Sequence, residues 1–498
     1  MIKVFSRSAV RKSDAEKISS GTPGKELMRR AAEGIADHIT KGGKVAVVCG
    51  KGNNGGDGFA LALILSERGS DCTVFTLSDV FSPDGEFYYK KCAGKGVKIE
   101  AFCENTDLSS FDTVVDCIYG TGFKGALTGV PKIAALKMNN SGKRIISADI
   151  NSGLDPDSGI SDLCVVSDLT VSIGFYKPGH FLGMAKDVIK NKVNVDIGLE
   201  PPDNPYGVYE KADAAKALKK RPAFCNKSDF GYIAIVGGCR RYGGAVKLAC
   251  MANAAMRSGA GVVKAAVPDV IAAGLSSRVI ESTVFPLSSE NGYIAFSEDE
   301  IKELIRGVKV VAFGMGAGQS EGVKRTLIYL LENFTGTLVI DADGLNALSR
   351  MGADRLKTAK CKTVLTPHVK EFSRLTGKEI NGILSDPISA AKDFAKEYGS
   401  VVLLKGTATV VTDGDTVNIA DTGCSGMATA GSGDVLSGIT AALCGYNEDI
   451  LTAVTAAAYI NGRAGELAEK KTNCVSMIAS DTVSCIPEAI TELLNTGE

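Results

Sequence analysis

The stretch Ala430–Gly438 places the carboxylate of Asp434 directly after a Gly-Ser-Gly run. Apolar residues then recur at helical spacing, which predicts that a helix begins near Asp434. The unpaired N–H groups of a first helical turn attract anions, and glycines let an anion approach the backbone closely. Asp434 could therefore act as a general base beside a phosphate group. Taken alone, the stretch fits equally well an acidic residue that only complements the helix dipole.

Three other stretches of the second half, Asp341–Asn346, Leu365–Phe372 and Lys405–Thr409, each follow an apolar segment that predicts a strand. Because the carboxyl ends of parallel strands share one edge of a sheet, we expect all three at that edge. A lysine, a glycine and a threonine in the last stretch suit a polyphosphate. His368 is a candidate ligand contact, although a lone histidine is more often a satisfied core or turn residue. The loop Gly314–Gly318 would also allow close backbone approach.

In the first half, the apolar run Lys44–Cys49 is followed by the glycine-rich Gly50–Gly58 and by an expected helix from Phe59 to Arg68. The run matches the G-x-G-x-x-G fingerprint of dinucleotide-binding domains, so a hydride-transfer domain with Asp79 as the ribose acid is one alternative. However, this stretch also holds two asparagines and Asp57, which is more polar than a pyrophosphate turn requires. A purely structural alternative remains, because Asn and Gly often occupy left-handed turn positions.

Two further carboxylates, Asp116 and Asp149, stand at the ends of predicted strands, each beside another glycine-containing loop. In a parallel sheet they would share an edge with Asn53 and Asn54. Amide, carboxylate and hydroxyl oxygens of this kind suit a hard cation. A single strand-end aspartate is more often a cap, but three such loops in one sheet favour a site.

The elements that must position these residues alternate between strands and helices, which predicts two α/β domains with mostly parallel, doubly wound sheets. An amphipathic stripe predicts a helix over 26–39. The strands expected in the first half are 44–49, 72–77, 97–101, 113–118, 144–149 and 169–173. Those expected in the second half are 232–238, 262–267, 308–313, 337–341, 363–365, 401–404 and 409–412. Helices are expected over 244–258, from Asp434, and over 451–469, where we expect the domain to finish.

The length of 498 residues allows two large domains, and the turn-rich 200–207 with the basic 216–222 predicts a linker. We expect an N-terminal domain over 1–215 and a C-terminal domain over 216–498. The formal net charge of −1 and the absence of a basic tract or long apolar run argue against nucleic-acid and membrane binding. Fourteen cysteines without a C-x-x-C pair, and only three histidines, favour reduced thiols such as Cys49, Cys117 and Cys250 over disulfides or zinc ligands. A cytoplasmic protein is expected.

With these motifs in order, roughly residues 10–200 resemble the YjeF N-terminal domain, the NAD(P)H-hydrate epimerase, which is Rossmann-like. The matching stretches are Gly52–Gly58, Asp116 with Tyr119–Phe123, and Asp149–Asp155. The resemblance implies that a potassium ion is held by Asn54, Asp116 and Ser152, and that Asp149 is the acid/base group that epimerises C6 of the hydrated ring. It implies substrate contacts by Asn53, Asn54, Gly55, Gly56, Asp57, Gly120, Thr121, Gly122, Phe123, Lys124, Gly125, Ala126 and Asp149.

Roughly residues 225–495 resemble the YjeF C-terminal domain, the NAD(P)H-hydrate dehydratase, which has a ribokinase-like fold. The matching stretches are Gly259–Gly261, Gly314–Gly318, Asp341–Asn346, Thr366–His368, Lys405–Thr407 and Gly431–Asp434. The resemblance implies that Asp434 is the base and that the hydrated nucleotide contacts Ala260, Gly318, His368 and Asp434. It implies that the adenine nucleotide contacts Lys405, Gly406, Thr407, Ala408, Thr409 and Gly433. Three residues depart from the family pattern: Arg29 replaces Glu, Met315 replaces Pro and Ser432 replaces Thr.

We therefore expect a bifunctional repair enzyme that interconverts the R and S hydrates of NADH and NADPH and dehydrates the S form with ADP, giving AMP and phosphate. The resemblance supplies ADP, because nothing in the residues separates ADP from ATP. Mg²⁺ is expected with the nucleotide and K⁺ in the epimerase domain. A homo-oligomer is expected because large α/β enzymes are often symmetric. Two alternatives stay open: a ribokinase-like small-molecule kinase fused to a nucleotide-binding module, and a non-catalytic binding protein.

Overall fold

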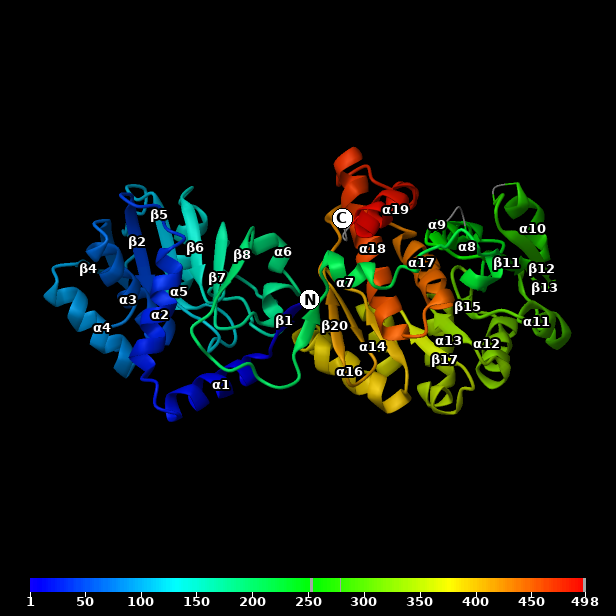
Figure 1. Ribbon diagram of the computed structural model, residues 1–498, viewed down its shortest axis with the longest axis horizontal. Helices are drawn as coiled ribbons and strands as arrows, with labels where there is room; N and C mark the ends of the chain where they lie inside the picture. Colours follow the sequence, from blue (N-terminus) through cyan, green and yellow to red (C-terminus); the bar gives the residue numbers. More distant parts are fainter. Residues whose placement is uncertain (251–253, 278, 496–498) are drawn as a thin grey trace. The chain divides into compact units, whose positions relative to one another are not determined.

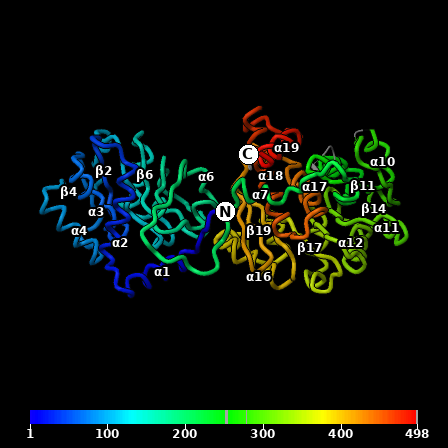
Figure 2. Tube along the Cα trace, viewed as in Figure 1, coloured from blue at the N-terminus to red at the C-terminus, as the bar shows by residue number. Residues whose placement is uncertain are grey.

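The computed structural model describes residues 1–250, 254–277 and 279–495. The chain forms two compact units, one of residues 3–205 and one of residues 206–498 together with Met1 and Ile2 (Figure 1). The boundary between the units in the sequence therefore falls between Pro205 and Tyr206, earlier than the expected boundary at 215/216. Figure 2 traces the path of the chain through both units.

The N-terminal unit is built on a seven-stranded sheet in the order β4-β3-β2-β5-β6-β7-β8, and every neighbouring pair is parallel. All six expected strands are present, within about one residue at either end. The strands are β2 (Lys44–Cys49), β3 (Asp71–Thr76), β4 (Lys98–Ala101), β5 (Thr113–Cys117), β6 (Arg144–Ala148), β7 (Leu169–Ile173) and β8 (Lys192–Val195).

Helices cover both faces of this sheet, as a doubly wound fold requires. On one face α2 and α3 pack on strand residues such as Val47 and Val115, and on the other face α5 packs on Ala46 and Val48. The expected helix 26–39 is present as α2. The helices are α1 (Arg7–Ser19), α2 (Gly24–Ala36), α3 (Asn53–Glu67), α4 (Pro83–Gly94), α5 (Gly129–Asn139) and α6 (Ala185–Val188), with a 3₁₀ turn, η1 (Pro178–His180).

Helix α3 begins at Asn53, so most of the stretch expected to be a glycine loop is the first turns of a helix. Several positions of this helix require glycine because neighbouring atoms lie where a Cβ would be. A Cβ on Gly55 would lie 1.9 Å from the Gly50 carbonyl oxygen, and one on Gly58 would lie 2.6 Å from the Cys49 sulfur. Close packing of α3 on the sheet therefore outweighs the low helix propensity of glycine. The helix presents Asn53, Asn54 and Asp57 at its N-terminal end.

The C-terminal unit is built on an eleven-stranded sheet in the order β1-β9-β20-β19-β18-β17-β16-β15-β10-β11-β12. Strands from β12 through β18 pair in parallel, whereas β19 pairs antiparallel with both β18 and β20. The seven expected strands are all present. The strands are β1 (Ile2–Val4), β9 (Tyr206–Val208), β10 (Tyr232–Val236), β11 (Val262–Pro268), β12 (Thr283–Leu287), β15 (Val310–Phe313), β16 (Thr337–Ile340), β17 (Lys362–Leu365), β18 (Val401–Leu404), β19 (Thr409–Thr412) and β20 (Val417–Ala420), with a separate hairpin of β13 (Ser289–Glu290) and β14 (Tyr293–Ile294).

The largest apolar core of this unit joins one face of the sheet to α8, α17, α18 and α19. Helices α12, α13, α14 and α16 belong to the opposite layer in Figure 1. The helices are α7 (Lys211–Ala215), α8 (Gly243–Cys250), α9 (Ala254–Arg257), α10 (Asp269–Ser276), α11 (Glu298–Leu304), α12 (Glu321–Asn333), α13 (Asp343–Met351), α14 (Val369–Thr376), α15 (Ile380–Ser385), α16 (Pro387–Tyr398), α17 (Ser432–Tyr446), α18 (Ile450–Lys471) and α19 (Ala479–Leu494), with the 3₁₀ turns η2 (Lys227–Phe230), η3 (Ala353–Thr358) and η4 (Ser425–Met427).

The helices of this unit differ from the expected ones in two places. The helix expected over 244–258 corresponds to α8 and α9, and residues 251–253 between them lie outside the described residues. The expectation that a helix over 451–469 finishes the domain was wrong, because α19 follows α18 and packs along it. Helix α19 contains Pro487, which disfavours a helix interior when the sequence is considered alone.

None of the helices that the structure describes combines the length and apolar character that a membrane span requires. All fourteen cysteines are free thiols, and Cys49, Cys117 and Cys250 are fully buried, which confirms the interpretation of the cysteines as unpaired. Burial raises the pKa of Cys49 well above that of an ordinary thiol. These thiols are therefore neutral members of the core.

Candidate functional site

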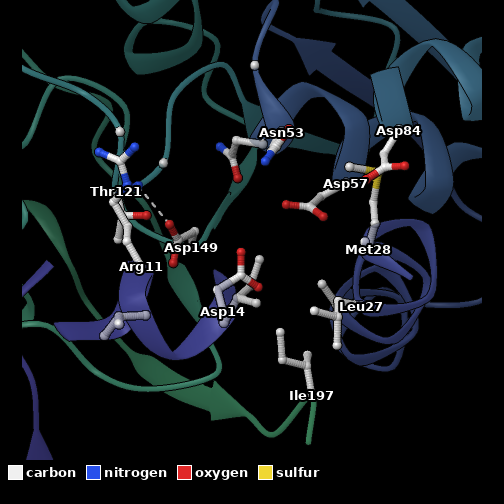
Figure 3. Close-up of a pocket in the computed structure, with 18 of the residues that line it drawn as sticks. Arg11, Asp14, Leu27, Met28, Asn53, Asp57, Asp84, Thr121, Asp149 and Ile197 are labelled. Carbon is white, nitrogen blue, oxygen red and sulfur yellow. Dashed lines mark hydrogen bonds between the residues drawn. The ribbon is translucent and has the colours of Figure 1, made fainter. Parts of the chain in front are cut away.

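The N-terminal unit contains a cavity of about 600 Å³ at the carboxyl end of its sheet (Figure 3). Its walls come from the N-terminal end of α3, the loops after β5 and β6, and helices α1 and α2. Exposed residues such as Lys51 and Asn53 belong to the wall, so the cavity opens to solvent. The cavity therefore lies at the sheet edge where ligands bind in open α/β folds.

Asp149 follows β6 and is held at both its backbone and its side chain. Its φ of 66° is in the left-handed region, which a non-glycine residue adopts only when its surroundings enforce it. The Thr121 N–H donates to Asp149 Oδ2 at 2.8 Å, and the ammonium of Lys177 forms an ion pair with Oδ1. His180 Nε2 donates to the Asp149 carbonyl oxygen at 2.8 Å, while its Nδ1 accepts from the Lys177 N–H at 3.0 Å. Lys177 and His180 thus fix the position of Asp149.

Charge within this group keeps Asp149 ionised. Burial would raise the pKa of Asp149, but the Lys177 ammonium outweighs it, so the pKa lies below its usual value. Burial and the Lys177 charge lower the pKa of His180 to about 4, which makes its imidazole neutral. A fully buried lysine next to a carboxylate is stable only as such a pair. Sequence reasoning did not select Lys177 or His180, and a lysine in a short loop gives little signal of such a role.

Two other carboxyl groups, those of Asp14 and Asp57, point into the same cavity (Figure 3). Burial raises the pKa of Asp57 well above its usual value, and the charges of Asp149 and Asp14 raise it further against the opposing effect of Lys177. Burial and the Asp149 charge also raise the pKa of Asp14. The cavity therefore brings together an ionised carboxylate and carboxyl groups that retain their protons more readily.

Beside the cavity, the carboxylate of Asp116 is fully buried and accepts four hydrogen bonds. Ser152 donates two of them, from its hydroxyl at 2.5 Å and its N–H at 2.9 Å. The structure therefore brings Asp116 and Ser152 together, as expected. Asn54 is also buried, and neither Oδ1 nor Nδ2 of its amide has a hydrogen-bond partner in the described protein. A buried amide without a partner is costly unless a ligand satisfies it.

Eight of the thirteen expected substrate contacts of this unit line the cavity, and five do not. A Cβ on Gly120 would lie 2.6 Å from Asp149 Oδ2 and 3.4 Å from the amide carbon of Asn54, so only glycine fits there. The eight are Asn53, Asn54, Asp57, Gly120, Thr121, Gly122, Phe123 and Asp149; the five are Gly55, Gly56, Lys124, Gly125 and Ala126. The alternative ribose acid, Asp79, is exposed and does not line the cavity.

In the C-terminal unit, Asp341, Lys405 and Ser437 meet at the carboxyl ends of β16 and β18. Lys405 Nζ donates to Asp341 Oδ1 at 3.1 Å, and Ser437 Oγ donates to Asp341 Oδ2 at 2.7 Å. Glu371, which is buried at the start of α14, lies 3.9 Å from Lys405 Nζ. Burial opposes the charge of Lys405, yet the two carboxylates raise its pKa, so the ammonium stays charged. Sequence reasoning placed the Asp341 stretch at this edge but gave no role to Glu371 or Ser437.

Helix α17 begins at Ser432, close to the predicted helix start at Asp434, and brings its N-terminal end to the same place. Gly431 caps the helix in the left-handed conformation with φ of 96°, and a Cβ on Gly433 would lie only 3.3 Å from Lys405 Nζ. The buried Ser432 hydroxyl has no hydrogen-bond partner in the described protein. Burial, followed by the charge of Asp341, raises the pKa of Asp434 to about 7 against the opposing effect of Lys405. This carboxylate can therefore exchange a proton near neutral pH.

The remaining expected contacts of this unit are not all in one place. His368 caps α14 by accepting from the N–H groups of Lys370 and Glu371, and its backbone bridges to Lys405 in the neighbouring chain segment. Gly318 N–H donates to Asp343 Oδ2 at 2.8 Å. Ala260 is buried beside Gly259, which packs on Tyr446 at the end of α17 opposite to Asp434. The structure therefore does not bring Ala260 to Asp434.

Two of the three residues that depart from the family pattern, Arg29 and Met315, have partners nearby. Arg29 forms ion pairs with Glu26 and Glu33 on the surface of α2, and hydrogen bonds from Arg29 and Arg30 lower the pKa of Glu26 to about 2. Met315 is fully buried in the apolar core around α17, and its carbonyl accepts from the Gly238 N–H at 2.9 Å. Neither Arg29 nor Met315 is among the residues that line the cavity.

The fold and the two carboxylate sites define a protein of two α/β units, each with a candidate active site at the carboxyl end of its sheet. Residues 24–179 match a family described as YjeF-related protein N-terminus, and residues 233–488 match one described as NAD(P)H-hydrate dehydratase. Bifunctional NAD(P)H-hydrate repair enzymes from Thermofilum pendens and Moorella thermoacetica are each 33% identical to the chain, with 90% and 93% of the chain and 87% and 91% of the relatives covered. The chain belongs to the family of bifunctional NAD(P)H-hydrate repair enzymes.

Solved structures agree with the fold of the C-terminal unit. A ribokinase-like superfamily protein from Enterococcus faecalis V583 has a TM-score of 0.50 at 23% identity, and the match covers 58% of this chain and 96% of that protein. A hypothetical protein from Streptococcus mutans has a TM-score of 0.51 at 24% identity, with 57% and 99% covered. The expected ribokinase-like fold is therefore confirmed.

Proposed function

We propose that the chain repairs hydrated NADH and NADPH in two steps, one in each unit. The N-terminal unit is the NAD(P)H-hydrate epimerase, which interconverts the R and S forms, and the C-terminal unit is the dehydratase, which restores NAD(P)H from the S form. The observation that carries this proposal is the carboxylate at each site. Asp149 lies ionised in the cavity, and Asp434 lies beside Lys405 with a pKa of about 7.

For the epimerase we propose that Asp149 is the acid/base group of the epimerisation at C6 of the hydrated ring, and that its ionised carboxylate accepts a proton in the reaction. The Lys177 ion pair supports this role because it keeps the buried carboxylate ionised and so ready to accept a proton. The eight expected contact residues that line the cavity would bind the hydrated nucleotide. Gly55, Gly56, Lys124, Gly125 and Ala126 would act by shaping the backbone that carries them.

For the cation we propose that Asn54, Asp116 and Ser152 hold K⁺. The buried, unpartnered amide of Asn54 and the carboxylate and hydroxyl of the other two supply the oxygen atoms that a hard cation prefers. When bound, the ion would fix the N-terminal turn of α3 against the loop after β5. The ion would have a structural role, because the proton is transferred by Asp149, a side chain of the protein.

For the dehydratase we propose that Asp434 deprotonates the ring hydroxyl, which then receives the terminal phosphoryl group of ADP. The phosphate then leaves from C6 as the electron pair on N1 forms a double bond to C6, and a proton is lost from C5 to water. The C5–C6 double bond of NAD(P)H is thereby restored, and AMP and phosphate are the other products. Lys405 and the first turn of α17 lie where they can neutralise the phosphoryl oxygens, and the unpartnered Ser432 hydroxyl can donate to them. His368 and Gly318 would contact the hydrated nucleotide, whereas Ala260 is better explained as a core residue.

For the co-substrate we propose ADP, bound by Lys405–Thr409 and Gly433. The exposed backbone at Gly406 and Thr407, next to the charged Lys405, supports a phosphate-binding role. Mg²⁺ would enter with the nucleotide, because this ion binds through phosphates and one or two carboxylates, and Asp341 and Asp434 supply carboxylates here. Its chemistry is to neutralise the phosphate oxygens during transfer.

The test is to incubate the whole chain with mixed NADH hydrate epimers, ADP, Mg²⁺ and K⁺, and to follow the recovery of reduced-nicotinamide absorbance. We expect a fast phase from the S form and a slower phase from the R form, with complete conversion. Conversion of about half of the mixture would contradict the epimerase. No conversion with ADP or with ATP would contradict the dehydratase.

We also propose that the enzyme is a cytoplasmic homo-oligomer. The reduced thiols suit a reducing compartment, and symmetric assembly is common for large α/β enzymes. Light scattering on the purified chain measures the mass directly, and a mass near the 51.9 kDa of one chain would contradict the oligomer.

A further inference from the structure

The carboxyl group of Asp57 has no role in holding the fold. It projects from the N-terminal turns of α3 into the cavity (Figure 3), and no hydrogen bond or ion pair joins it to any residue that the structure describes. Asp149, by contrast, is bonded to Thr121 and Lys177. A partly buried carboxyl without a partner costs stability, so its presence in a cavity points to a function.

Asp57 and Asp149 approach the cavity from different walls. Asp149 stands on the loop after β6, and Asp57 stands on α3, which follows β2. Lys177 pairs with Asp149 and not with Asp57, so the two carboxyl groups have opposite environments. Two carboxyl groups whose surroundings separate their protonation states form a natural acid and base pair.

Resting on the epimerase activity proposed above, we propose that Asp57 is the proton donor of the epimerisation, opposite to the base Asp149. Asp57 donates its proton to the C6 hydroxyl, the C6–O bond breaks, and water leaves. The electron pair on N1 of the ring forms a double bond to C6 and so carries the positive charge. Water then adds to the other face of C6 and gives a proton to Asp149, so that atoms and charge balance. Because the cavity opens to solvent, the two carboxyl groups return to their starting states by exchange with water.

Asp57 suits this role better than the other acidic residue of the cavity centre, Asp14. Asp57 belongs to the same helical turn as Asn53 and Asn54, both of which line the cavity, whereas Asp14 comes from α1. Burial raises the pKa of Asp57 well above its usual value, so the group keeps its proton to higher pH than an ordinary carboxyl does. The titratable and charged groups that surround Asp57 in the cavity are Arg11, Asp14, Lys51, Asp84, Tyr119, Asp149 and Lys177, with the neutral thiols of Cys49 and Cys117 behind it.

The experiment compares the wild-type chain with Asp57→Asn in the two-phase assay, over a range of pH. The wild-type rate of the slow phase should fall as pH rises through the pKa of Asp57, because only the protonated carboxyl donates. Asp57→Asn should slow this phase by about 100-fold while the fast phase is unchanged. Its residual rate should not fall with rising pH over the same range.

Several outcomes would overturn the proposal. An unchanged slow phase in Asp57→Asn, or a slowed phase that still falls at high pH, would show that Asp57 does not donate the proton. If the slow-phase rate of Asp14→Asn no longer fell with rising pH while that of Asp57→Asn still did, the proton donor would be Asp14. Absence of the slow phase in the wild-type chain would instead contradict the proposed epimerase activity itself.

A matched control and a second variant complete the design. Asp71→Asn removes an exposed carboxyl at the start of β3, outside the cavity, and should leave both phases unchanged. Thermal unfolding of Asp57→Asn should match the wild type. Should that variant not fold, Asp57→Glu keeps a carboxyl and must retain a falling limb; its absence there would overturn the proposal.

Discussion

Asp149 shows at the residue scale how the fold sets the protonation state of one group. Its backbone is held in the left-handed region, its carbonyl is bonded to a neutral histidine, and its carboxylate is paired with a lysine that is fully buried. Neither charge is stable alone in that place, because desolvation of one ion is repaid only by the other. The pair therefore supplies an ionised base inside a partly apolar cavity.

Replacing Lys177 by Met should weaken the base. Burial raises the pKa of Asp149, and the Lys177 charge is the largest effect that lowers it, so the pKa should rise when the ammonium is removed. The group then ionises only at higher pH, so the pH profile of the slow-phase rate should shift to higher pH. At a fixed pH its rate should fall about tenfold for each unit by which the pKa exceeds that pH.

The measurement is the pH profile of the slow phase, with Lys177→Arg as the variant that keeps the charge. Lys177→Arg should recover part of the rate and move the profile back toward the wild type. A Lys177→Met profile with unchanged midpoint would show that the lysine has only a packing role.

At the scale of elements, the site depends on how closely α3 packs on the sheet. The helix carries Asn53, Asn54 and Asp57 to the carboxyl end of β2 only because Gly55 touches the backbone at Gly50. Backbone cannot move aside as a flexible side chain can. Gly55 and Gly58 therefore act by letting the helix pack closely on the sheet.

Gly55→Ala should disturb both stability and epimerisation. The added Cβ would lie 1.9 Å from the Gly50 carbonyl oxygen, so α3 must shift, at a cost of about 1–3 kcal/mol in the free energy of unfolding of the N-terminal unit. Urea unfolding measures the cost, and the slow phase should weaken while the fast phase persists.

The matched control is Gly94→Ala, in the last turn of α4, where a Cβ meets no atom within 4 Å. This change should leave activity unchanged and stabilise the unit by about 0.5–1 kcal/mol, because alanine restricts the unfolded chain. Equal stability effects of the two substitutions would contradict the packing explanation.

At the scale of the whole molecule, each site is formed by residues of one unit. Among the residues that the structure describes, those that line the epimerase cavity lie between Val10 and Leu199, and the charged groups that act on Asp434 belong to the second unit. Each half should therefore work when the other is inactive. The S hydrate made by one chain can then diffuse to the dehydratase of another.

Mixing two inactivated chains tests this independence. Asp149→Asn alone should convert only the S form beyond the background, and Asp434→Asn alone should exchange epimers without restoring NADH. An equimolar mixture should convert both epimers completely in the absorbance assay. A mixture that converts no more than Asp149→Asn alone would show that the intermediate passes only within one chain.

The sequence by itself determined the class of each domain and the positions of the strand-end residues. Asp116, Asp149, Asp341, Lys405 and Asp434 were predicted at strand or helix ends because apolar runs and helical spacing record which backbone is buried. Glycines at fixed distances from them marked the places where a backbone or ligand approaches closely. These features are local, so they can be read without knowing which segments meet.

Only the tertiary structure decided which side chains share a site and in which protonation state. Lys177 and His180 contact Asp149 although they lie far from it in the sequence. Side chains of α1 and α2 line the cavity, and no sequence motif identified them. The structure also separated Ala260 from Asp434. Asp434, ambiguous in its glycine stretch, has a pKa of about 7 because burial and the charge of Asp341 raise that pKa against the opposing effect of Lys405. Burial and charge pairing depend on the arrangement of the whole chain, which a one-dimensional pattern does not contain.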